Sequence, residues 1–371
     1  MFHAPNKQVH QFNQFYNMNR LRKKAYSLLN QVYYEYDRIR DYYRDKHLIR
    51  DLKLPKLSRK EKKEIKRTWP CFKFSNLDFI WMRIYKAEHG FDPYYLCDHQ
   101  YAQLLKIINR SSNWASLNNK ALSDIYMPKI PWPKVYLRRI NKKYYDNEMT
   151  EISFEQAVAI VQSQKQFVIK PATGTGGGKG VKVIDNFLNQ EEISKLFAAY
   201  DVDFVVQTLI VQSAELSRFN PTSVNTCRIT TIIMGSKQSY SAIFKVGRKN
   251  SRVDNWNSSV LIGVDKQGRL ADYGYDVNLK RIEKSDIGVP FAGNVLPKFA
   301  EMVELTLKYH NLYFPNISVV GWDITFENND DIVVIETNPD FPGVLGEQVC
   351  SGTFFKEFRD EICNAVNKRS K

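Results

Sequence analysis

Apolar residues recur every three or four positions in the first part of the chain, from Leu21 to Tyr43. This spacing predicts a long amphipathic helix whose other face carries Arg and Lys. A capping-box pattern, Ser58-Arg-Lys-Glu61, predicts a second and highly charged helix over about 59–68. Two further, more apolar helices are expected near 77–89 and 100–110. A helical region therefore opens the chain, and we expect it to cover 1–115.

The pattern changes to short apolar runs later in the chain. FVIK at 167–170 and VKVI at 181–184 predict two strands, and the loop at 174–180 between them has five Gly around Lys179. Backbone amides of such a loop can approach an anion closely, beside the lysine charge. A Walker A motif is excluded, because Thr173 and Gly180 stand where it requires Gly and Ser or Thr. We predict a hairpin flap over phosphates; a flexible hairpin without a ligand is the alternative.

A second hairpin carries acidic residues. Around 321–338 two apolar strands flank an Asn- and Asp-rich turn, and the alternation of side chains turns Asp323 away from the apolar face. A two-residue turn at Asn329-Asp330 would place Asp323 opposite Glu336, with Asn338 on the same face. Such oxygen donors suit magnesium together with phosphate oxygens, whereas a solvated sheet face is the alternative. Combined with the glycine flap, they predict a nucleotide–magnesium site.

Composition and charge modify this picture. The 371 residues are 43% hydrophobic, which excludes wholesale disorder, and the formal charge is +14. Residues 1–150 hold 30 Lys and Arg against 14 Asp and Glu, whereas 151–371 hold 24 against 26. The basic stretch at 50–67 is either a solvated helix face or a docking surface for an anionic membrane or glycan. Nucleic acid is disfavoured, because no base-reading motif accompanies the charge.

Cysteine usage and hydropathy bear on location. The five cysteines form no C-x-x-C motif, the N-terminus lacks the apolar stretch of a signal peptide, and no run approaches 18 apolar residues. We therefore expect reduced thiols and a cytoplasmic protein, with peripheral attachment to the inner face of the membrane as an option.

Ordered motifs then indicate a family. Lys120, FVIKPATGTGGGKG, FVVQTLI, NTCRI, GWDI and VVIETNP follow one another as in ATP-grasp enzymes. The run RFNPTSVNTCRITTI, followed by FKVGRKNSRVDNWNSSVLIGVD, resembles the sugar-transfer-associated ATP-grasp family of bacterial surface-polysaccharide pathways. The resemblance implies an α+β fold in which two α+β subdomains clamp ATP. We expect these at 116–210 and 211–371, after the basic helical region.

The resemblance also implies roles for individual residues. Lys120 and Lys170 would bind nucleotide phosphates, and Arg228 would contact the transferred phosphate. The carboxylates and amide of the hairpin match the ligands of two Mg²⁺ ions. The remaining implied nucleotide contacts are the flap residues Gly176, Gly177, Gly178 and Lys179, the adenine-binding hinge Gln207, Thr208, Leu209 and Ile210, and the ribose-binding acid Glu215.

The acceptor side is expected in the segment that begins at Lys245. Arg248 could hold a carboxylate through two parallel hydrogen bonds. Trp256 offers a stacking face for a sugar, and its neighbours could form hydrogen bonds with sugar hydroxyl groups. An ordinary surface loop is the alternative. The substrate-binding residues predicted here are Arg248, Asp254, Asn255, Trp256 and Asn257, and the predicted catalytic residues are Arg228, Lys245 and Arg248.

The resemblance implies an ATP-dependent carboxylate–amine ligase. The γ-phosphate would pass to a carboxylate, and an amine would attack the resulting acyl phosphate. The expected substrates are a uronic acid sugar and an amino acid or similar amine, in capsule or exopolysaccharide synthesis. The alternatives are a sugar phosphotransferase with a hydroxyl acceptor and a non-catalytic ATP-binding scaffold of a polysaccharide assembly.

Overall fold

The computed structural model describes residues 36, 39, 40, 42, 43, 46, 49, 50, 52–110, 114–174, 178–249, 251 and 258–369. The chain forms two compact units. One consists of Met1–Leu104 together with Phe355–Lys371, and the other is Leu105–Phe354. The predicted division at 115/116 and 210/211 stays a prediction. In the described part of the chain, no helix has both the length and the apolar character needed to cross a membrane.

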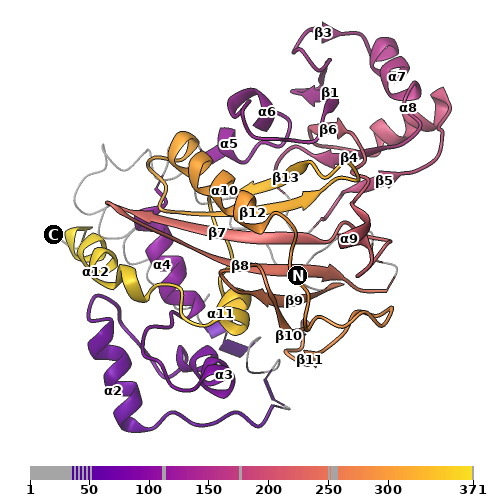
Figure 1. The fold of residues 1–371 in the computed structure, drawn as a ribbon. Coiled ribbons are helices and arrows are strands. Elements are labelled where there is room, and N and C mark those ends of the chain that lie inside the picture. Colours follow the sequence, from indigo (N-terminus) through magenta and orange to yellow (C-terminus); the bar gives the residue numbers. More distant parts are fainter. Residues whose placement is uncertain are drawn as a thin grey trace, which may run out of the picture. The chain divides into compact units, whose positions relative to one another are not determined.

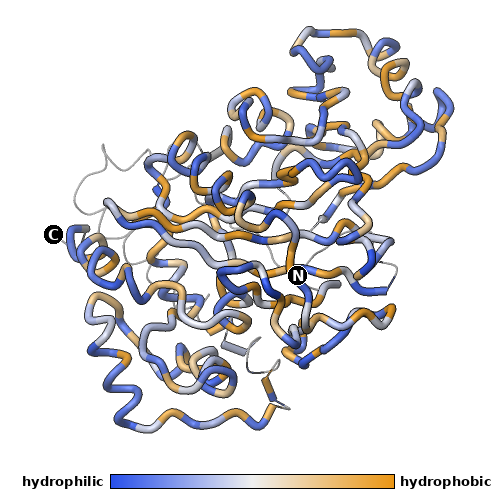
Figure 2. The backbone as a smooth tube through the Cα atoms, in the orientation of Figure 1, coloured by the Kyte–Doolittle hydropathy of each residue, from blue (hydrophilic) through white to orange (hydrophobic). Residues whose placement is uncertain are grey.

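The first unit is helical. Its second helix, α2, begins with the predicted capping box: Glu61 N donates to Ser58 Oγ, and Ser58 N donates to the Glu61 carboxylate. Apart from the buried Ile65, α2 is mostly hydrophilic (Figure 2). The helix predicted from Leu21 lies largely outside the described residues. The helices of this unit, with α4 continuing into the second, are α2 (Arg59–Thr68), α3 (Phe79–His89), α4 (Asp98–Ile108), the 3-10 turn η3 (Lys356–Phe358) and α12 (Arg359–Arg369).

The second unit contains a six-stranded antiparallel sheet with the order β3-β2-β1-β6-β4-β5 (Figure 1). Helices α7 and α8 pack on it through buried apolar residues such as Val158 and Phe197. The elements are α5 (Trp114–Leu117), α6 (Ser123–Tyr126), β1 (Val135–Ile140), β2 (Lys143–Tyr145), β3 (Glu151–Ile152), α7 (Phe154–Gln162), β4 (Phe167–Pro171), β5 (Lys182–Ile184), α8 (Gln190–Ala198) and β6 (Phe204–Gln207).

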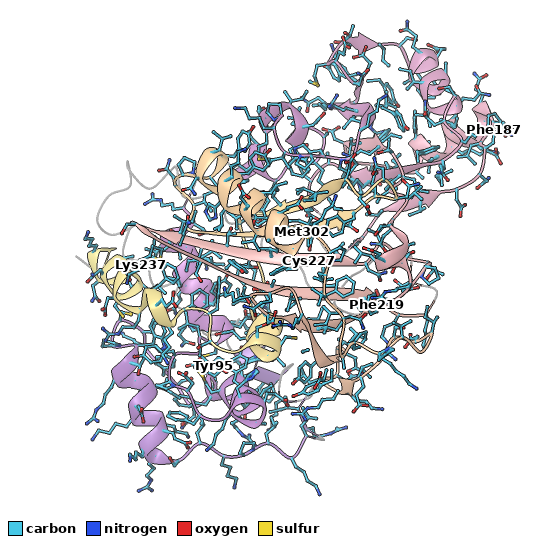
Figure 3. All side chains as sticks on the ribbon, viewed as in Figure 1. Tyr95, Phe187, Phe219, Cys227, Lys237 and Met302 are labelled. Atoms are coloured by element: carbon cyan, nitrogen blue, oxygen red, sulfur yellow. The ribbon has the colours of Figure 1, made fainter. Side chains whose placement is uncertain are left out.

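A seven-stranded antiparallel sheet, in the order β11-β10-β9-β8-β7-β12-β13, forms the rest of this unit. Helix α10 contacts β7 and β12, and its Met302 shares the hydrophobic core with Cys227 of β7 (Figure 3). The predicted α+β fold with two sheets is thus confirmed. The elements are α9 (Ala214–Ser217), β7 (Thr226–Met234), β8 (Lys237–Gly247), β9 (Ser259–Val264), β10 (Leu270–Tyr275), β11 (Arg281–Ile282), α10 (Phe299–Tyr313), β12 (Val319–Phe326), β13 (Ile332–Asn338) and α11 (Leu345–Ser351).

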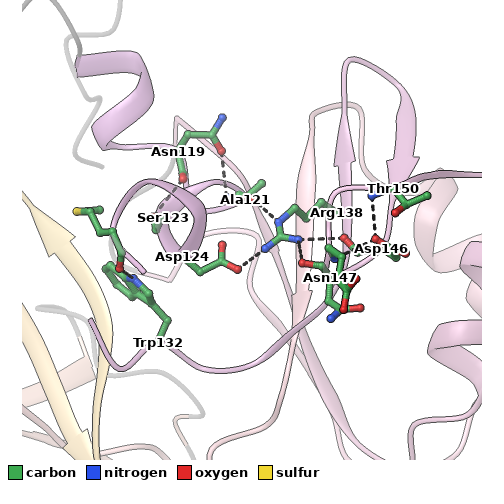
Figure 4. A network of polar contacts seen from close by, with 11 residues as sticks. Asn119, Ala121, Ser123, Asp124, Trp132, Arg138, Asp146, Asn147 and Thr150 are labelled. Atoms are coloured by element: carbon green, nitrogen blue, oxygen red, sulfur yellow. Dashed lines mark hydrogen bonds and ion pairs between the residues drawn. The ribbon is translucent and has the colours of Figure 1, made fainter. Parts of the chain in front are cut away.

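A buried arginine ties the segment before the first sheet to that sheet (Figure 4). Arg138 on β1 is fully buried and forms an ion pair with Asp124 of α6. Its guanidinium also donates to the carbonyl oxygens of Ala121 at 2.7 Å, Asp146 at 3.0 Å and Asn147 at 2.9 Å. Because Ala121 follows Lys120 directly, this network helps to fix the position of that lysine.

Removing the buried guanidinium should destabilise the protein strongly. In Arg138→Met three carbonyls and the Asp124 carboxylate lose their donor, so we expect the free energy of unfolding to fall by about 3 kcal/mol. Chemical denaturation measures the change. Lys143→Met is the matched control, since its ion pair with Glu151 is exposed and should contribute little to stability. Equal stabilities of the two variants would contradict this account.

Candidate nucleotide and metal site

The two faces of the seven-stranded sheet differ in chemistry. Alternate residues of β7 and β12, such as Ile229 and Trp322, enter the hydrophobic core. The strand register places the intervening residues on the opposite side, with Arg228 paired to Asp323 and Asp323 paired to Glu336. We call this side the polar face. It consists of Arg228, Lys245, Asp323, Glu336 and Asn338.

The β12–β13 hairpin pairs Asp323 with Glu336 as predicted, but its turn differs from the predicted one. Asp323 lies opposite Glu336, and Asn338 is paired with Gly321 on the same face, as predicted. The predicted two-residue turn is wrong. The loop has one residue more, since Glu327 N donates to Asp331 O and Asp330 adopts a positive φ of 65°. A β-bulge next to Asp323 then shifts the register back.

Asp323 is held by two cations. Arg228 donates through Nε to Oδ1 at 2.8 Å and through Nη2 to Oδ2 at 2.7 Å, while Lys245 Nζ lies 2.8 Å from Oδ1. Burial would raise the pKa of Asp323, but Arg228 and Lys245 hold it well below its usual range. The Asp323 carboxylate is therefore ionised. Together with Arg228 and Lys245 it carries one net positive charge, next to the oxygens of Glu336 and Asn338.

Lys120 links the polar face to the first sheet. Its Nζ lies 3.1 Å from Glu336 Oε1, and its backbone N donates to Ala172 O, just beyond β4. The structure thus brings one predicted phosphate lysine to a predicted metal ligand. This contact joins residues that are more than 200 positions apart in the chain, within the same compact unit.

Lys170 is a buried amine that is unpaired among the described residues. Its side chain, near the end of β4, is 8% exposed and forms no hydrogen bond or ion pair with a described residue. Burial lowers its pKa to about 8, the charge of Lys120 acts in the same direction, and Glu336 opposes both. A buried and unpaired ammonium is costly, so this position favours binding of an anion.

The flap has the predicted strand–loop–strand form. β4 pairs with β5, and Gly178 and Gly180 have φ values of 72° and 77°. A Cβ at Gly180 would lie 2.8 Å from Pro171 Cγ, so glycine is required there. Lys179 is exposed between them. Gly176 and Gly177 lie outside the described residues.

The predicted hinge follows β6. Gln207 is the last residue of that strand, and Thr208 N donates to Lys134 O at 2.9 Å. Leu209 and Ile210 form no backbone hydrogen bond with a described residue, which leaves their N–H and C=O groups for a ligand such as adenine. Glu215 is exposed on α9 and lines a pocket of about 450 Å³. None of the residues that line this pocket belongs to the polar face.

The predicted acceptor residues are only partly described. Arg248 faces carboxylates of its own chain: Nη2 lies 3.1 Å from Asp286 Oδ1, and Nη1 lies 3.5 Å from Asp276 Oδ2. A substrate carboxylate would have to displace Asp286 in order to form two parallel hydrogen bonds with the Nε and Nη2 groups of Arg248. The other predicted substrate residues, Asp254, Asn255, Trp256 and Asn257, lie outside the described residues.

A further carboxyl group lies next to the polar face. Glu347 on α11 is 1% exposed, and its Oε1 accepts a hydrogen bond of 2.6 Å from Thr230 Oγ1. Burial raises its pKa to about 8, and Arg228 and Lys245 act against that shift. This residue was not predicted, because a single Glu in the run PDFPGVLGEQVC matches no motif.

The oxygen donors of the polar face are of the types that bind magnesium ions in proteins. Asp323, Glu336 and Asn338 supply two carboxylates and one amide oxygen on one side of a rigid hairpin. No group of three or more His, Cys, Asp or Glu suited to a metal ion occurs among the described residues. A magnesium ion bound here would therefore need phosphate oxygens to complete its coordination.

Comparisons with known proteins indicate a family. A family model described as sugar-transfer associated ATP-grasp matches residues 99–364. A search of curated proteins by sequence finds no match.

Three solved structures resemble the chain at low identity. D-Alanine-D-alanine ligase from Helicobacter pylori is 13% identical, with 67% of this chain and 58% of that chain covered and a TM-score of 0.39. N5-carboxyaminoimidazole ribonucleotide synthetase in complex with ADP is 14% identical, with 72% and 58% covered and a TM-score of 0.44. The biotin carboxylase domain of Hydrogenobacter thermophilus 2-oxoglutarate carboxylase, solved with MgADP, is 12% identical, with 67% and 46% covered and a TM-score of 0.42.

The chain thus spans 58% of the length of each of the first two enzymes. These likenesses do not identify a substrate. The family model covers well over half of the chain. ATP-grasp enzymes are typically ATP-dependent, ADP-forming ligases. The chain belongs to the sugar-transfer associated ATP-grasp family.

Proposed function

We propose that the chain is an ATP-dependent carboxylate–amine ligase that joins an amino acid or similar amine to a uronic acid in surface-polysaccharide synthesis. The observation that carries the proposal is the polar face, where Arg228 and Lys245 lie against Asp323, opposite Glu336. Cations and oxygen donors on one partly buried face suit the transfer of a phosphoryl group, because the protein must neutralise its charge but need not react with it covalently.

In this proposal some residues bind ATP and others neutralise the charge of its phosphates. Lys170 and Lys120 bind the phosphates of ATP, and the free backbone groups of Leu209 and Ile210 bind adenine. The oxygens of Asp323, Glu336 and Asn338 would hold Mg²⁺, which would supply positive charge against the negative charge of the ATP phosphates. The flap that carries Gly178 and Gly180 covers the phosphates and excludes water.

The reaction then proceeds in two displacements. A carboxylate oxygen of the sugar attacks the γ-phosphorus, and ADP leaves. Arg228 and Lys245 stabilise the charge on the transferring phosphoryl group. The amine attacks the acyl carbon, inorganic phosphate leaves, and the amine loses a proton. Arg248 and the segment 254–257 orient the sugar, with Arg248 exchanging Asp286 for the substrate carboxylate.

The basic N-terminal region provides a docking surface for an anionic glycan or membrane in this proposal. Residues 50–67 carry nine Lys and Arg against three acids, and most of α2 is exposed and hydrophilic (Figure 2). Attraction of this kind weakens as salt is added, since exposed charges are screened within about 10 Å at 0.1 M ionic strength.

An acceptor screen tests the proposed activity. The full chain is incubated with Mg²⁺, ATP, pooled amino acids and uronic-acid sugars, and the release of ADP and phosphate is measured. We expect both products together, and a hydroxamate of the sugar when hydroxylamine replaces the amine. Phosphate retained on the sugar would indicate a phosphotransferase instead. ATP binding without turnover on any acceptor would leave the scaffold alternative.

A further inference from the structure

Two thiols that are far apart in the sequence meet within the first unit. Cys71 follows α2 and Cys363 lies in α12, and their Sγ atoms are 2.6 Å apart across a separation of 292 residues. Both are free cysteines in the structure. A disulfide bond is about 2.05 Å long. The two sulfur atoms could therefore bond after only a small movement.

Neighbouring contacts fix the two segments against each other. Arg359, one turn before Cys363 in α12, donates through Nε to Thr68 O at 2.8 Å, three residues before Cys71. Tyr101 of α4 packs on Phe355 with ring centroids 5.5 Å apart. Cys363 is 6% exposed, whereas Cys71 is half-buried. The contact between the sulfurs is thus part of the folded unit, and solvent reaches it from the side of Cys71.

The surroundings make one sulfur nucleophilic. The contact with Cys71 lowers the pKa of the Cys363 thiol; burial opposes this shift, and the Arg359 guanidinium supports it. The same contact raises the pKa of Cys71, and burial acts in the same direction. Thiolates, rather than thiols, attack oxidants and disulfides. Cys363 would be the attacking sulfur and Cys71 the resolving thiol.

We propose that Cys71 and Cys363 form a redox-modification site, in which a peroxide closes a reversible disulfide between the helical N-terminal region and α12. The Cys363 thiolate attacks a peroxide oxygen, the O–O bond breaks and water leaves after protonation, which gives a sulfenic acid. The Cys71 sulfur then attacks the Cys363 sulfur, the S–O bond breaks and a second water leaves. Two thiols lose two electrons and two protons, and hydrogen peroxide is reduced to two waters.

Closing this bond should stabilise the folded state. The disulfide would close a loop of 292 residues, and a loop of that length removes much conformational freedom from the unfolded chain. Peptide mapping of the full chain under non-reducing conditions, after mild hydrogen peroxide treatment, tests the proposal. We expect one cross-linked peptide pair containing Cys71 and Cys363, which dithiothreitol separates, and an increase of about 5 °C in the unfolding temperature.

Variants separate the two sulfurs. In Cys71→Ser, oxidation should stop at a sulfenic acid on Cys363, which dimedone labels, and the increase in unfolding temperature should vanish. Cys350→Ser is the matched control, and it should keep both the cross-link and the temperature shift. If both thiols of the wild type remain open to alkylation after peroxide treatment, or if the cross-link joins another pair of cysteines, the proposal is wrong.

Discussion

Replacing Glu336 with glutamine is expected to reduce turnover about a thousandfold or more, while the fold remains intact. Glu336 lies directly opposite Asp323 in the β12–β13 hairpin and forms an ion pair with Lys120, whose Nζ is 3.1 Å from Glu336 Oε1. Glutamine has nearly the same shape but lacks the negative charge, so a bound Mg²⁺ and Lys120 would both lose their anionic partner. The ion pair of Glu336 with Lys120 is partly exposed, so its loss should cost little stability and the variant should unfold close to wild type.

Rates of ADP release with and without acceptor measure this effect, and circular dichroism checks the fold. Glu304→Gln is the matched control, because Glu304 is exposed on α10, the helix that covers the apolar face of the same sheet. Its activity should equal that of wild type. Wild-type turnover in Glu336→Gln would disprove the metal assignment even if ATP still binds.

Lys170→Met should weaken ATP binding about a hundredfold and at the same time stabilise the protein without ATP. The ammonium is 8% exposed and unpaired among the described residues, so it costs free energy in the folded state and gains an anion only when a nucleotide binds. Methionine has a similar length and carries no charge. We expect the free energy of unfolding at pH 7 to rise by about 2 kcal/mol.

The pH dependence of this gain follows from the sign of the shift. The pKa of Lys170 is about 8 in the folded protein against an ordinary 10.5, so the unfolded chain binds the extra proton between these values. The penalty in the wild type is complete below pH 8 and disappears as the pH rises toward 10.5. Calorimetric titration of ATP and denaturation at pH 7 and pH 10 measure both effects. Lys165→Met, at an exposed position just before β4, is the control and should change neither.

The sequence was sufficient for features that depend on local pattern. The capping box at Ser58 and Glu61 is formed as predicted, because its geometry needs only four consecutive residues. The glycine loop is flanked by the two predicted strands, which pair with each other. The pairing of Asp323 with Glu336 was also predicted, although the longer loop and the bulge offset each other and neither was foreseen.

Features that depend on contacts between distant segments could not be predicted. The ion pairs of Asp323 with Arg228 and Lys245 require the register of three neighbouring strands. Glu347 comes near these residues only because α11 lies against β8 and β9. Arg248 was expected to be open to a substrate, but Asp286, nearly 40 residues later, lies within 3.1 Å of it. Nothing in the spacing of the cysteines indicated that Cys71 and Cys363 meet.

The first unit is built from two segments that are far apart in the sequence, which affects how it can fold during synthesis. Helices α2 and α3 leave the ribosome early, but their unit also includes Phe355–Lys371, which is made after the sheets of the second unit. The sheets of the second unit can therefore fold during translation, since domains generally fold as units. The helical unit must wait for α12, and until then its apolar side chains, such as Tyr101, lack partners like Phe355. A chaperone that binds apolar segments would therefore shield this early part of the nascent chain until α12 has been made.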